Sequence, residues 1–415
     1  MKCVWLYSKR HFTPGVDSDL NGSSAGVISK EIYETLASIE NLELYYYDAF
    51  NLEEWKSVNS DILVSIVDSF DLAYWYFKPK IAILIAVNQH PFDRLLTTAD
   101  TSKKSWPKNV LSGSDGYLQN ANGLRKANAV IYVGNEITAL SFKNYLPETK
   151  LYQAYYLPHS GIRGSHQETK ESRSVLVLMS SIGFRKGFDR FYEALNLDSE
   201  ALSKFKFNIV GSPEGDFWEE KVLELTYKYP NVNFQGWISN LSPEFQSILN
   251  NSDYAIFPTR EEGMVGSLLE CIASGILCLH TQNSGLDNSL DFLKLPSVGN
   301  LNLANKLNFI DGLDDSQRNS VKEIQKIDLN FQIKMSESVG NALMLAINEA
   351  NTNKKIWSKF VFKYYVSYLR VYAKVPSGIL FRRFKFISRN SLRNRLYLRH
   401  LKLLKFSITF KNLIS

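Results

Sequence analysis

Short apolar runs alternate with amphipathic stretches along most of the chain. In the first half the apolar runs have strand length, and Ile81–Val87 is almost entirely Ala, Ile, Leu and Val. Strands that are buried on both faces have this pattern, and helices between them are typical of βαβ units with parallel sheets. The expected strands are Lys2–Tyr7, Leu42–Tyr47, Ile62–Val67, Ile81–Val87, Ala129–Val133 and Leu151–Leu157, with helices over Ser24–Ile39, Ser114–Lys126 and Glu136–Tyr145.

The alternation stops near residue 165 and then starts again. Residues 161–173 are largely polar and charged, which favours a linker. The strands expected after it are Val175–Met179, Phe205–Val210, Val232–Gln235, Tyr254–Phe257 and Leu277–His280. The expected helices are Gly187–Leu195, Phe217–Tyr229, Pro243–Asn250, Ser267–Ser274, Leu301–Phe309, Ser316–Gln325 and Lys334–Asn348.

The length of 415 residues exceeds one ordinary hydrophobic core, so we expect two domains. The pattern predicts an α/β protein with Rossmann-like domains over residues 1–165 and 166–350. Ligands of such folds bind beyond the carboxyl ends of the strands, which makes the interdomain cleft the expected site.

Composition narrows the class of protein. Hydrophobic residues make up 45% of the chain and charged residues 22%, which is ordinary for a globular protein. The three cysteines fit neither a disulfide framework nor a zinc template, so reduced thiols in the cytoplasm are the simplest interpretation. The longest apolar run has only strand length, and the first residues lack the form of a signal peptide. We therefore expect no segment that crosses a bilayer.

The charge is distributed unevenly. The net charge is +6, yet residues 351–415 hold 16 of the 48 Lys and Arg and no Asp or Glu. Residues 376–415 interleave these bases with Phe, Leu and Tyr, which favours an amphipathic helix on an anionic membrane surface. Docking of this tail onto the acidic body is the alternative. Nucleic acid is not an expected partner, because no known binding module accompanies the charge.

The segment 257–270 has the densest set of candidate binding residues. It is predicted to run from a strand through a tight loop into a helix. Gly263 and Gly266 permit close approach of backbone to a ligand, and the N–H groups where the helix begins suit an anionic diphosphate. The carboxylates of Glu262 and Glu270 suit the paired hydroxyls of a sugar or ribose. The alternative is that Glu262 caps the loop and Glu270 is a solvated helix residue.

A second strand, loop and helix covers residues 175–191. Lys186 there offers a point charge to a diphosphate, and Arg185 offers a bidentate grip. A solvated pair of basic residues on a turn is the alternative.

These two segments resemble family 4 (group 1) retaining glycosyltransferases of the GT-B fold. Glu262 and Glu270 have the spacing of the family's E-x7-E motif, and residues 273–276 match the small-residue turn after it. Lys186-Gly187 matches the family's Lys-Gly, but Ser180 and Ser181 stand where the family has an Arg. Residues 127–136, 207–212 and 231–237 resemble further strands of the family, so the resemblance extends over about residues 120–375.

The resemblance implies a role for each matching residue. Glu262 contacts the donor sugar and Glu270 the ribose, while Lys186, with Arg185 as a substitute for the absent Arg, stabilises the leaving diphosphate. The implied donor-binding residues are Arg185, Gly211, Gly263, Met264, Val265, Gly266, Ser267 and Glu270. The implied catalytic residues are Glu262, Lys186 and His90. Retention at the anomeric carbon is likewise implied, and no metal or cofactor is expected, since no Asp-x-Asp motif stands in a matching loop.

Two loops of the first half are candidates for the acceptor side. His90 follows the strand Ile81–Val87, at the place of a family His that lies near the reacting sugar; an ordinary loop residue is equally consistent. Gly22 and Ser23 lie in a Gly-rich loop that in the family approaches phosphate or acceptor, although a simple turn with a Ser N-cap explains them as well.

These observations predict a sugar transferase of surface polysaccharide or glycolipid synthesis, lipopolysaccharide included. Its partners would be a nucleotide sugar, a glycan or lipid-linked acceptor, and the inner face of the cell membrane. The resemblance also implies a crossover helix over residues 351–375 that returns to the first domain. A nucleotide-sugar epimerase and a non-catalytic glycan-binding or scaffold subunit remain alternatives. A dinucleotide oxidoreductase is disfavoured, because no strand is followed by G-x-G-x-x-G.

Overall fold

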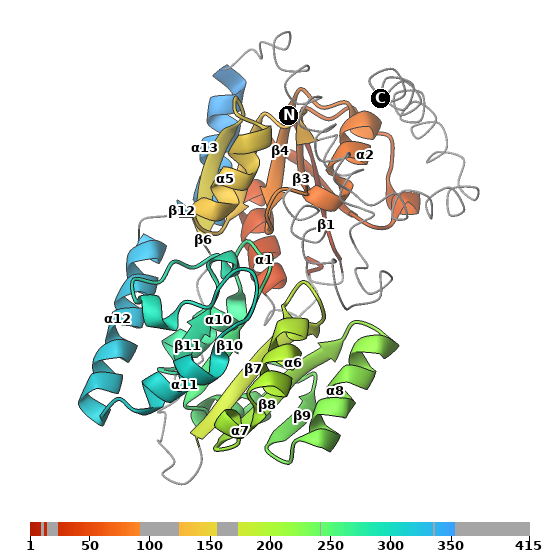
Figure 1. Ribbon diagram of the computed structural model, residues 1–415. Coiled ribbons are helices and arrows are strands. Elements are labelled where there is room, and N and C mark those ends of the chain that lie inside the picture. Colours follow the sequence, from red (N-terminus) through yellow and green to blue (C-terminus); the bar gives the residue numbers. More distant parts are fainter. Residues whose placement is uncertain are drawn as a thin grey trace, which may run out of the picture. The chain divides into compact units, whose positions relative to one another are not determined.

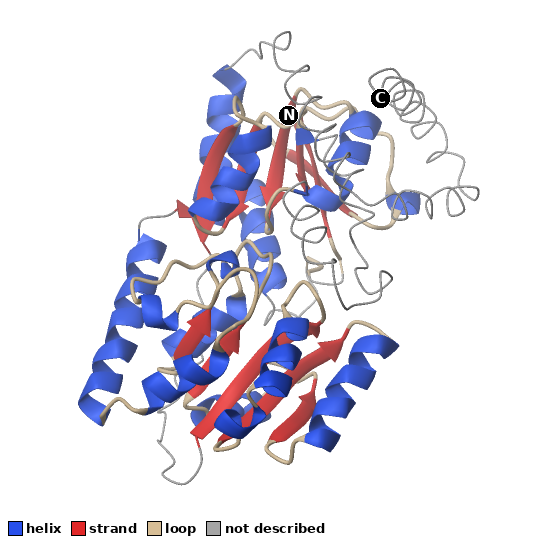
Figure 2. Cartoon of the chain, in the orientation of Figure 1, coloured by secondary structure: helices blue, strands red, loops and turns tan. Residues whose placement is uncertain are grey.

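The computed structural model describes residues 1–9, 12–14, 24–91, 124–155, 173–240, 242–334 and 337–352. These residues form two parallel β-sheets with helices packed against them (Figures 1 and 2). Both sheets belong to one compact unit, Met1–His90 with Asn122–Lys354.

The first sheet has seven strands in the order β12-β6-β5-β4-β3-β1-β2, and every pairing in it is parallel. Its strands are β1 Lys2–Tyr7, β2 Glu43–Asp48, β3 Ile62–Ile66, β4 Ile81–Ala86, β5 Ala129–Val133, β6 Lys150–Tyr155 and β12 Glu337–Ser338. The central strands β3, β4 and β5 are buried at every position, as their unbroken apolar runs predict. The helices of this half are α1 Ser24–Ala37, α2 Val67–Phe77, α5 Glu136–Tyr145 and α13 Val339–Thr352, with the short η2 Leu52–Glu54.

The second sheet has five parallel strands in the order β11-β10-β7-β8-β9. Its strands are β7 Arg173–Ile182, β8 Phe205–Pro213, β9 Val232–Gly236, β10 Tyr254–Phe257 and β11 Leu277–His280. Its helices are α6 Phe188–Leu197, α7 Ser199–Leu202, α8 Asp216–Lys228, α9 Pro243–Asn250, α10 Gly266–Ala273, α11 Leu303–Asp311 and α12 Asp315–Lys334, with η4 Gln282–Ser284 and η5 Asp291–Leu293.

The return of the chain to the first sheet differs from the prediction. Strand β12 pairs with β6, and α13 packs against α1 and against β4, β5 and β6 (Figure 1). The chain has therefore returned to the first sheet by residues 337–352, within the stretch assigned to the second domain, while the crossover helix predicted over 351–375 lies outside the described residues from 353 on. An amphipathic pattern predicts a helix but does not identify the sheet that covers its apolar face.

Some of the other predicted elements match the structure, and some lie outside the described residues. The helix α2 is absent from the predicted elements, whereas α5, α9, β1, β5, β10 and β11 have the predicted bounds. The linker, the predicted helix at 114–126 up to residue 123, and the residues after 352 lie outside the described residues. Among the described residues no helix combines the length and the apolar character that crossing a bilayer requires.

Candidate active site

Three loops leave the same edge of the second sheet, because β7, β8 and β10 are parallel neighbours. The loop after β7 and the loop after β10 interlock. Arg260 donates its backbone N–H to the carbonyl of Arg185 at 3.0 Å. A Cβ on Gly187 would lie 2.0 Å from the carbonyl oxygen of Pro258, so only glycine allows this close approach.

A buried ionic cluster lies where these loops meet. Lys186 Nζ lies 2.8 Å from Glu262 Oε1, and the guanidinium of Arg185 pairs with the same carboxylate oxygen. Lys186 is 7% exposed and Glu262 is 8% exposed. The structure thus brings together three of the predicted site residues, which come from two loops that are separated by more than 70 positions.

The electrostatics of the cluster favour an additional anion beside Lys186. Burial lowers the pKa of Lys186 well below its usual range, and the neighbouring positive charge of Arg185 lowers it further. Glu214, which accepts a hydrogen bond from Ser181 at 2.7 Å, partly opposes this shift. A phosphate oxygen near the ammonium would stabilise its charged form.

The amino end of α10 and a second carboxylate follow Glu262 in the chain. Val265 is the N-cap of α10 and makes no side-chain cap, so the first N–H groups of the helix point out of its end. Glu270 lies one turn further, is 6% exposed and accepts a hydrogen bond from Asn240 Nδ2 at 3.3 Å. Burial raises the pKa of Glu270 to about 7, and the Asn240 hydrogen bond lowers it only in part.

A segment that the sequence did not single out holds the loop after β10. In this segment, residues 281–287, the carbonyls of Asn283 and Ser284 accept hydrogen bonds from the backbone N–H groups of Glu262 and Val265, at 3.0 and 2.9 Å. The hydroxyl of Thr281 donates to the carbonyl of Thr259 at 2.5 Å. The backbone on both sides of Glu262 is therefore fixed by its neighbours.

A second buried ion pair supports the same loop. Arg260 pairs with Asp189 near the start of α6, and its guanidinium carbon lies 4.3 Å from the ring centre of Phe184. Both charged side chains are buried, with 6% of Arg260 and 3% of Asp189 exposed. The sequence gives no signal for this pair, because its partners are 71 positions apart and belong to no short motif.

Gly263 lies directly against the first sheet. Its N–H donates to the carbonyl of Val87 at 3.0 Å, and an added Cβ would lie 2.2 Å from Val133 O and 2.4 Å from Val87 O. The close approach is thus made to the carboxyl ends of two strands of the first sheet. The structure therefore explains Gly263 by its contact with these strands, and its predicted approach to a ligand stays a prediction.

Gly211 is explained by packing as well. Its φ is +147°, and a Cβ there would lie 1.7 Å from the carbonyl oxygen of Met179. The β7–β8 register shifts between Leu178 and Ser181, so the glycine accommodates an irregular stretch of β7. The structure therefore explains Gly211 by its strand neighbour, and its predicted proximity to a nucleotide stays a prediction.

His90 is buried within the first half. Its ring stacks on Tyr145 at 4.6 Å between centroids and meets Phe142 edge-on at 5.3 Å, while its backbone N–H donates to the Ser141 hydroxyl at 2.9 Å. The residue is 0% exposed, and burial lowers the pKa of the imidazole to about 3. In this conformation His90 is a buried, neutral residue packed on Tyr145 and Phe142, and its predicted contact with a sugar stays a prediction.

The remaining predicted residues divide into two groups. Met264 and Val265 are buried at the end of the loop that leads from β10 to α10. Gly266 and Ser267 lie in the first turn of α10. Gly22 and Ser23 lie outside the described residues. No group of three or more His, Cys, Asp or Glu side chains within the described ranges is arranged to hold a metal ion.

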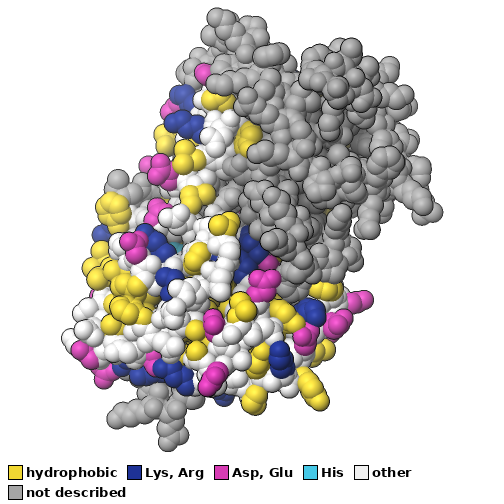
Figure 3. Space-filling view, viewed as in Figure 1, with side chains coloured by type: hydrophobic (Ala, Val, Ile, Leu, Met, Phe, Trp, Pro, Cys, Tyr) yellow, Lys and Arg dark blue, Asp and Glu magenta, His cyan; other side chains and the backbone are white. Residues whose placement is uncertain are grey.

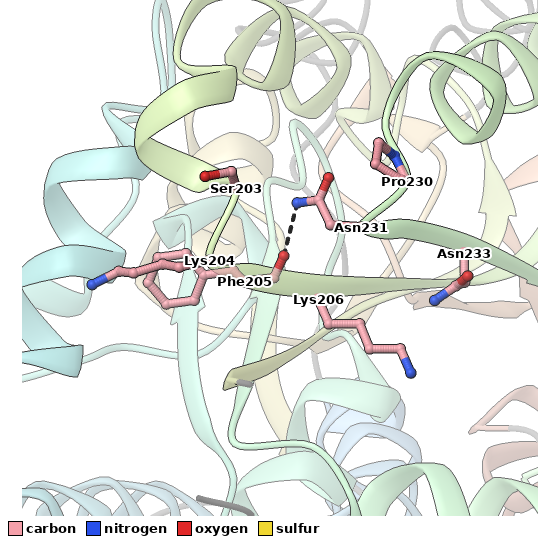
Figure 4. A pocket seen from close by; sticks show the side chains of 7 residues that line it. All are labelled: Ser203, Lys204, Phe205, Lys206, Pro230, Asn231 and Asn233. Carbon is pink, nitrogen blue, oxygen red and sulfur yellow. Dashed lines mark hydrogen bonds between the residues drawn. The ribbon is translucent and has the colours of Figure 1, made fainter. Parts of the chain in front are cut away.

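A shallow hollow of about 370 Å³ lies at the other edge of the second sheet, where β8 and β9 begin (Figure 4). Two of its polar side chains are already engaged: Lys204 pairs with Asp311 at 2.8 Å, and Asn231 donates to the carbonyl of Phe205 at 2.8 Å. The hollow is remote from the loops that hold the ionic cluster, since parallel strands place their amino ends at the opposite edge.

Part of the chain matches a known family model. Residues 173–292, which include all of the loops described above on the second sheet, match the family model described as glycosyl transferases group 1. The predicted resemblance to group 1 glycosyltransferases is thereby confirmed for this part of the chain, while family 4 stays a prediction. The comparison with curated protein sequences finds no match.

Solved structures of low sequence identity share the fold. Sucrose-phosphate synthase from Thermosynechococcus elongatus is 12% identical over 85% of this chain and 100% of its own, with a TM-score of 0.59. An E. coli structure described as trehalose-6-phosphate bound with UDP-2-fluoro glucose is 10% identical over 85% and 100%, with a TM-score of 0.55. These likenesses confirm the GT-B fold.

A third similar structure belongs to a longer chain. TarM of S. aureus is 14% identical over 71% of this chain, with a TM-score of 0.49. This chain spans 56% of the length of TarM.

Proposed function

We propose that this chain, a GT-B protein whose residues 173–292 match group 1 glycosyltransferases, transfers a sugar from a nucleotide sugar to an acceptor hydroxyl with retention of configuration. The observation that carries the proposal is the buried cluster of Glu262, Arg185 and Lys186 beside the amino end of α10. A nucleotide sugar needs cations for its diphosphate and a carboxylate for its sugar hydroxyls, and this cluster supplies both.

Binding of the donor would exchange ionic partners within the cluster. Without a ligand, the Glu262 carboxylate pairs with both Arg185 and Lys186. A diphosphate would draw the two cations toward itself, which would free the Glu262 carboxylate to accept hydrogen bonds from the sugar. The N–H groups at the start of α10 would contribute to the same diphosphate site.

Glu270 would hold the ribose. Its carboxylate is oriented by Asn240 and lies one helical turn from the proposed phosphate site. The pKa of about 7 leaves both protonation states accessible near neutral pH. Paired hydrogen bonds from the two ribose hydroxyls favour the ionised form.

The reaction would need no protein nucleophile. The acceptor oxygen forms a bond to the anomeric carbon while the bond from that carbon to the leaving phosphate oxygen breaks. The acceptor proton passes to the leaving phosphate, whose charge Lys186 and Arg185 stabilise. We propose that the site works without a metal ion or cofactor.

The acceptor would be a glycan or lipid-linked glycan at the cytoplasmic face of the cell membrane. The support is the acid-free basic stretch at residues 376–415, which lies outside the described residues. The described part of the chain instead shows mixed charges on the face in Figure 3. Each base near an anionic leaflet contributes about 1 kcal/mol of attraction.

Flotation with liposomes tests the membrane proposal. The full chain and a truncation after Ser377 are compared on anionic and on neutral vesicles. The proposal expects flotation of the full chain alone, on anionic vesicles alone. Equal binding of the two chains to anionic vesicles would exclude the tail as the membrane contact.

A donor panel tests the catalytic proposal. Wild-type protein and Lys186→Met are incubated with a set of nucleotide sugars, and release of nucleoside diphosphate is measured with and without glycan acceptors. Acceptor-dependent release that Lys186→Met reduces by about 100-fold supports a transferase. Conversion of the donor to an isomer would indicate an epimerase instead, and binding without turnover would indicate a scaffold.

A further inference from the structure

Asn135 connects the first sheet to the segment that holds the Glu262 loop. It follows β5 and caps α5, because its Oδ1 accepts a hydrogen bond from Ile137 N–H at 3.2 Å. Its Nδ2 donates to the carbonyl of Gln282 at 3.1 Å and to Asp287 Oδ1 at 2.9 Å. The side chain is 1% exposed, so these bonds are shielded from water.

The segment that Asn135 contacts is the one that fixes the backbone of Glu262. Between Gln282 and Asp287, the carbonyl of Asn283 accepts from Glu262 N–H at 3.0 Å. A Cβ on Gly285 would lie 1.5 Å from Gly263 O, so this segment and the Glu262 loop are in direct backbone contact. A displacement of the segment therefore moves the backbone on which Glu262 stands.

A second contact runs in parallel but is weaker. Gln89, which follows β4, donates to Asn283 Oδ1 at 3.4 Å. The longer distance makes this a poorer hydrogen bond than either bond made by the Asn135 amide. Among the described residues, Asn135 is consequently the main polar link between the first sheet and residues 282–287.

We propose that Asn135 is a positioning residue for the transfer reaction: its amide holds residues 282–287, and they hold Glu262 in register with the donor sugar. This inference rests on the proposed function, because it assigns Glu262 to the donor. The inference predicts different effects on the sugar subsite and on the nucleotide subsite. Loss of the amide would displace Glu262, whereas Lys186 and Glu270 would still bind the nucleotide through contacts within the second half.

The test must distinguish positioning from capping of α5. Asn135→Ser retains a good N-cap residue but lacks the amide. Asn51→Ser is the matched control: Asn51 caps η2 with its Oδ1 and uses its Nδ2 only for Glu54, three residues away. Both variants are compared with wild type in thermal unfolding, in binding of a nucleoside diphosphate and in steady-state turnover of the best donor.

The expected result is a split between binding and turnover. Asn135→Ser should lower kcat roughly tenfold, since small misplacements of reacting groups are costly, and should leave nucleoside diphosphate affinity within about twofold of wild type. Asn51→Ser should leave both unchanged. Unchanged kcat in Asn135→Ser overturns the inference, and so does a matched loss of kcat and nucleotide affinity, which indicates a general structural defect.

A charge exchange provides a second test. Asn135→Asp keeps the N-cap but sets two carboxylates against each other, so its kcat should fall below that of Asn135→Ser. Adding Asp287→Asn restores one donor and one acceptor between the side chains at positions 135 and 287, so part of the lost kcat should return. Absence of any recovery in the double variant contradicts the proposed link. If wild-type protein itself turns over no donor, the proposed function fails, which differs from active wild-type protein with unaffected Asn135 variants.

Discussion

Substitution of Gly263 by Ala should disable the proposed site through a clash with the other half of the chain. The new Cβ would lie 2.2 Å from Val133 O and 2.4 Å from Val87 O, whereas real Cβ contacts essentially never fall below 3.0 Å. The loop must therefore retreat by about 0.8 Å, and both opposing atoms are backbone carbonyls at strand ends. A misplacement of about 1 Å costs on the order of 100-fold in rate, and overpacking costs about 1–3 kcal/mol of stability.

Gly312→Ala is the matched control for the added methyl group. Gly312 has φ −76°, and its Cβ would meet nothing nearer than 3.4 Å. Turnover and urea denaturation of both variants are measured beside wild type, and the control should remain within about 0.5 kcal/mol of wild-type stability. If Gly263→Ala keeps more than half of the wild-type turnover and unchanged stability, the added methyl group does not clash with the first sheet as proposed.

Two further predictions concern buried titratable groups. Burial raises the pKa of Glu270 from 4.5 to about 7, so the folded state holds a proton that the unfolded state releases between these values, and stability falls by roughly 3 kcal/mol as pH rises through that window. Glu270→Gln should flatten this part of the curve in urea denaturation at pH 5 and pH 8, and an unchanged slope contradicts the assignment. Burial lowers the pKa of His90 from 6.5 to about 3, so unfolding takes up a proton and stability is lost as pH falls through that range. His90→Gln should be less sensitive to acid in thermal unfolding, and its pH dependence of turnover near neutral pH should match that of wild type. A shifted pH dependence would indicate that His90 takes part in the reaction.

The grouping of Arg185, Lys186 and Glu262 was predictable because parallel strands end at one edge of their sheet. The motif around Glu262 also identified the helix that begins at Gly266. The sequence pattern did not show which charged side chains pair with one another. The structure pairs Glu262 with the two cations, whereas the sequence analysis assigned the three residues only their contacts with a ligand.

The role of Gly263 was not predictable, because a glycine signals missing side-chain volume and not the atoms that occupy the space. Asn135 shows the same limit. Its capping of α5 is a local pattern, but its amide bonds reach residues 147 and 152 positions away. The burial of His90 was not predictable for a related reason: a His after a buried strand has the same sequence context whether its ring faces a cleft or packs on Tyr145.

Calorimetric titration of Glu262→Gln with a nucleoside diphosphate and with the matching nucleotide sugar tests the central claim most directly. The variant should bind the diphosphate at least as well as wild type, because Arg185 and Lys186 are no longer held by a carboxylate. The extra affinity that the sugar gives wild-type protein should disappear in the variant. A variant that keeps this sugar-dependent gain would show that Glu262 does not contact the donor sugar.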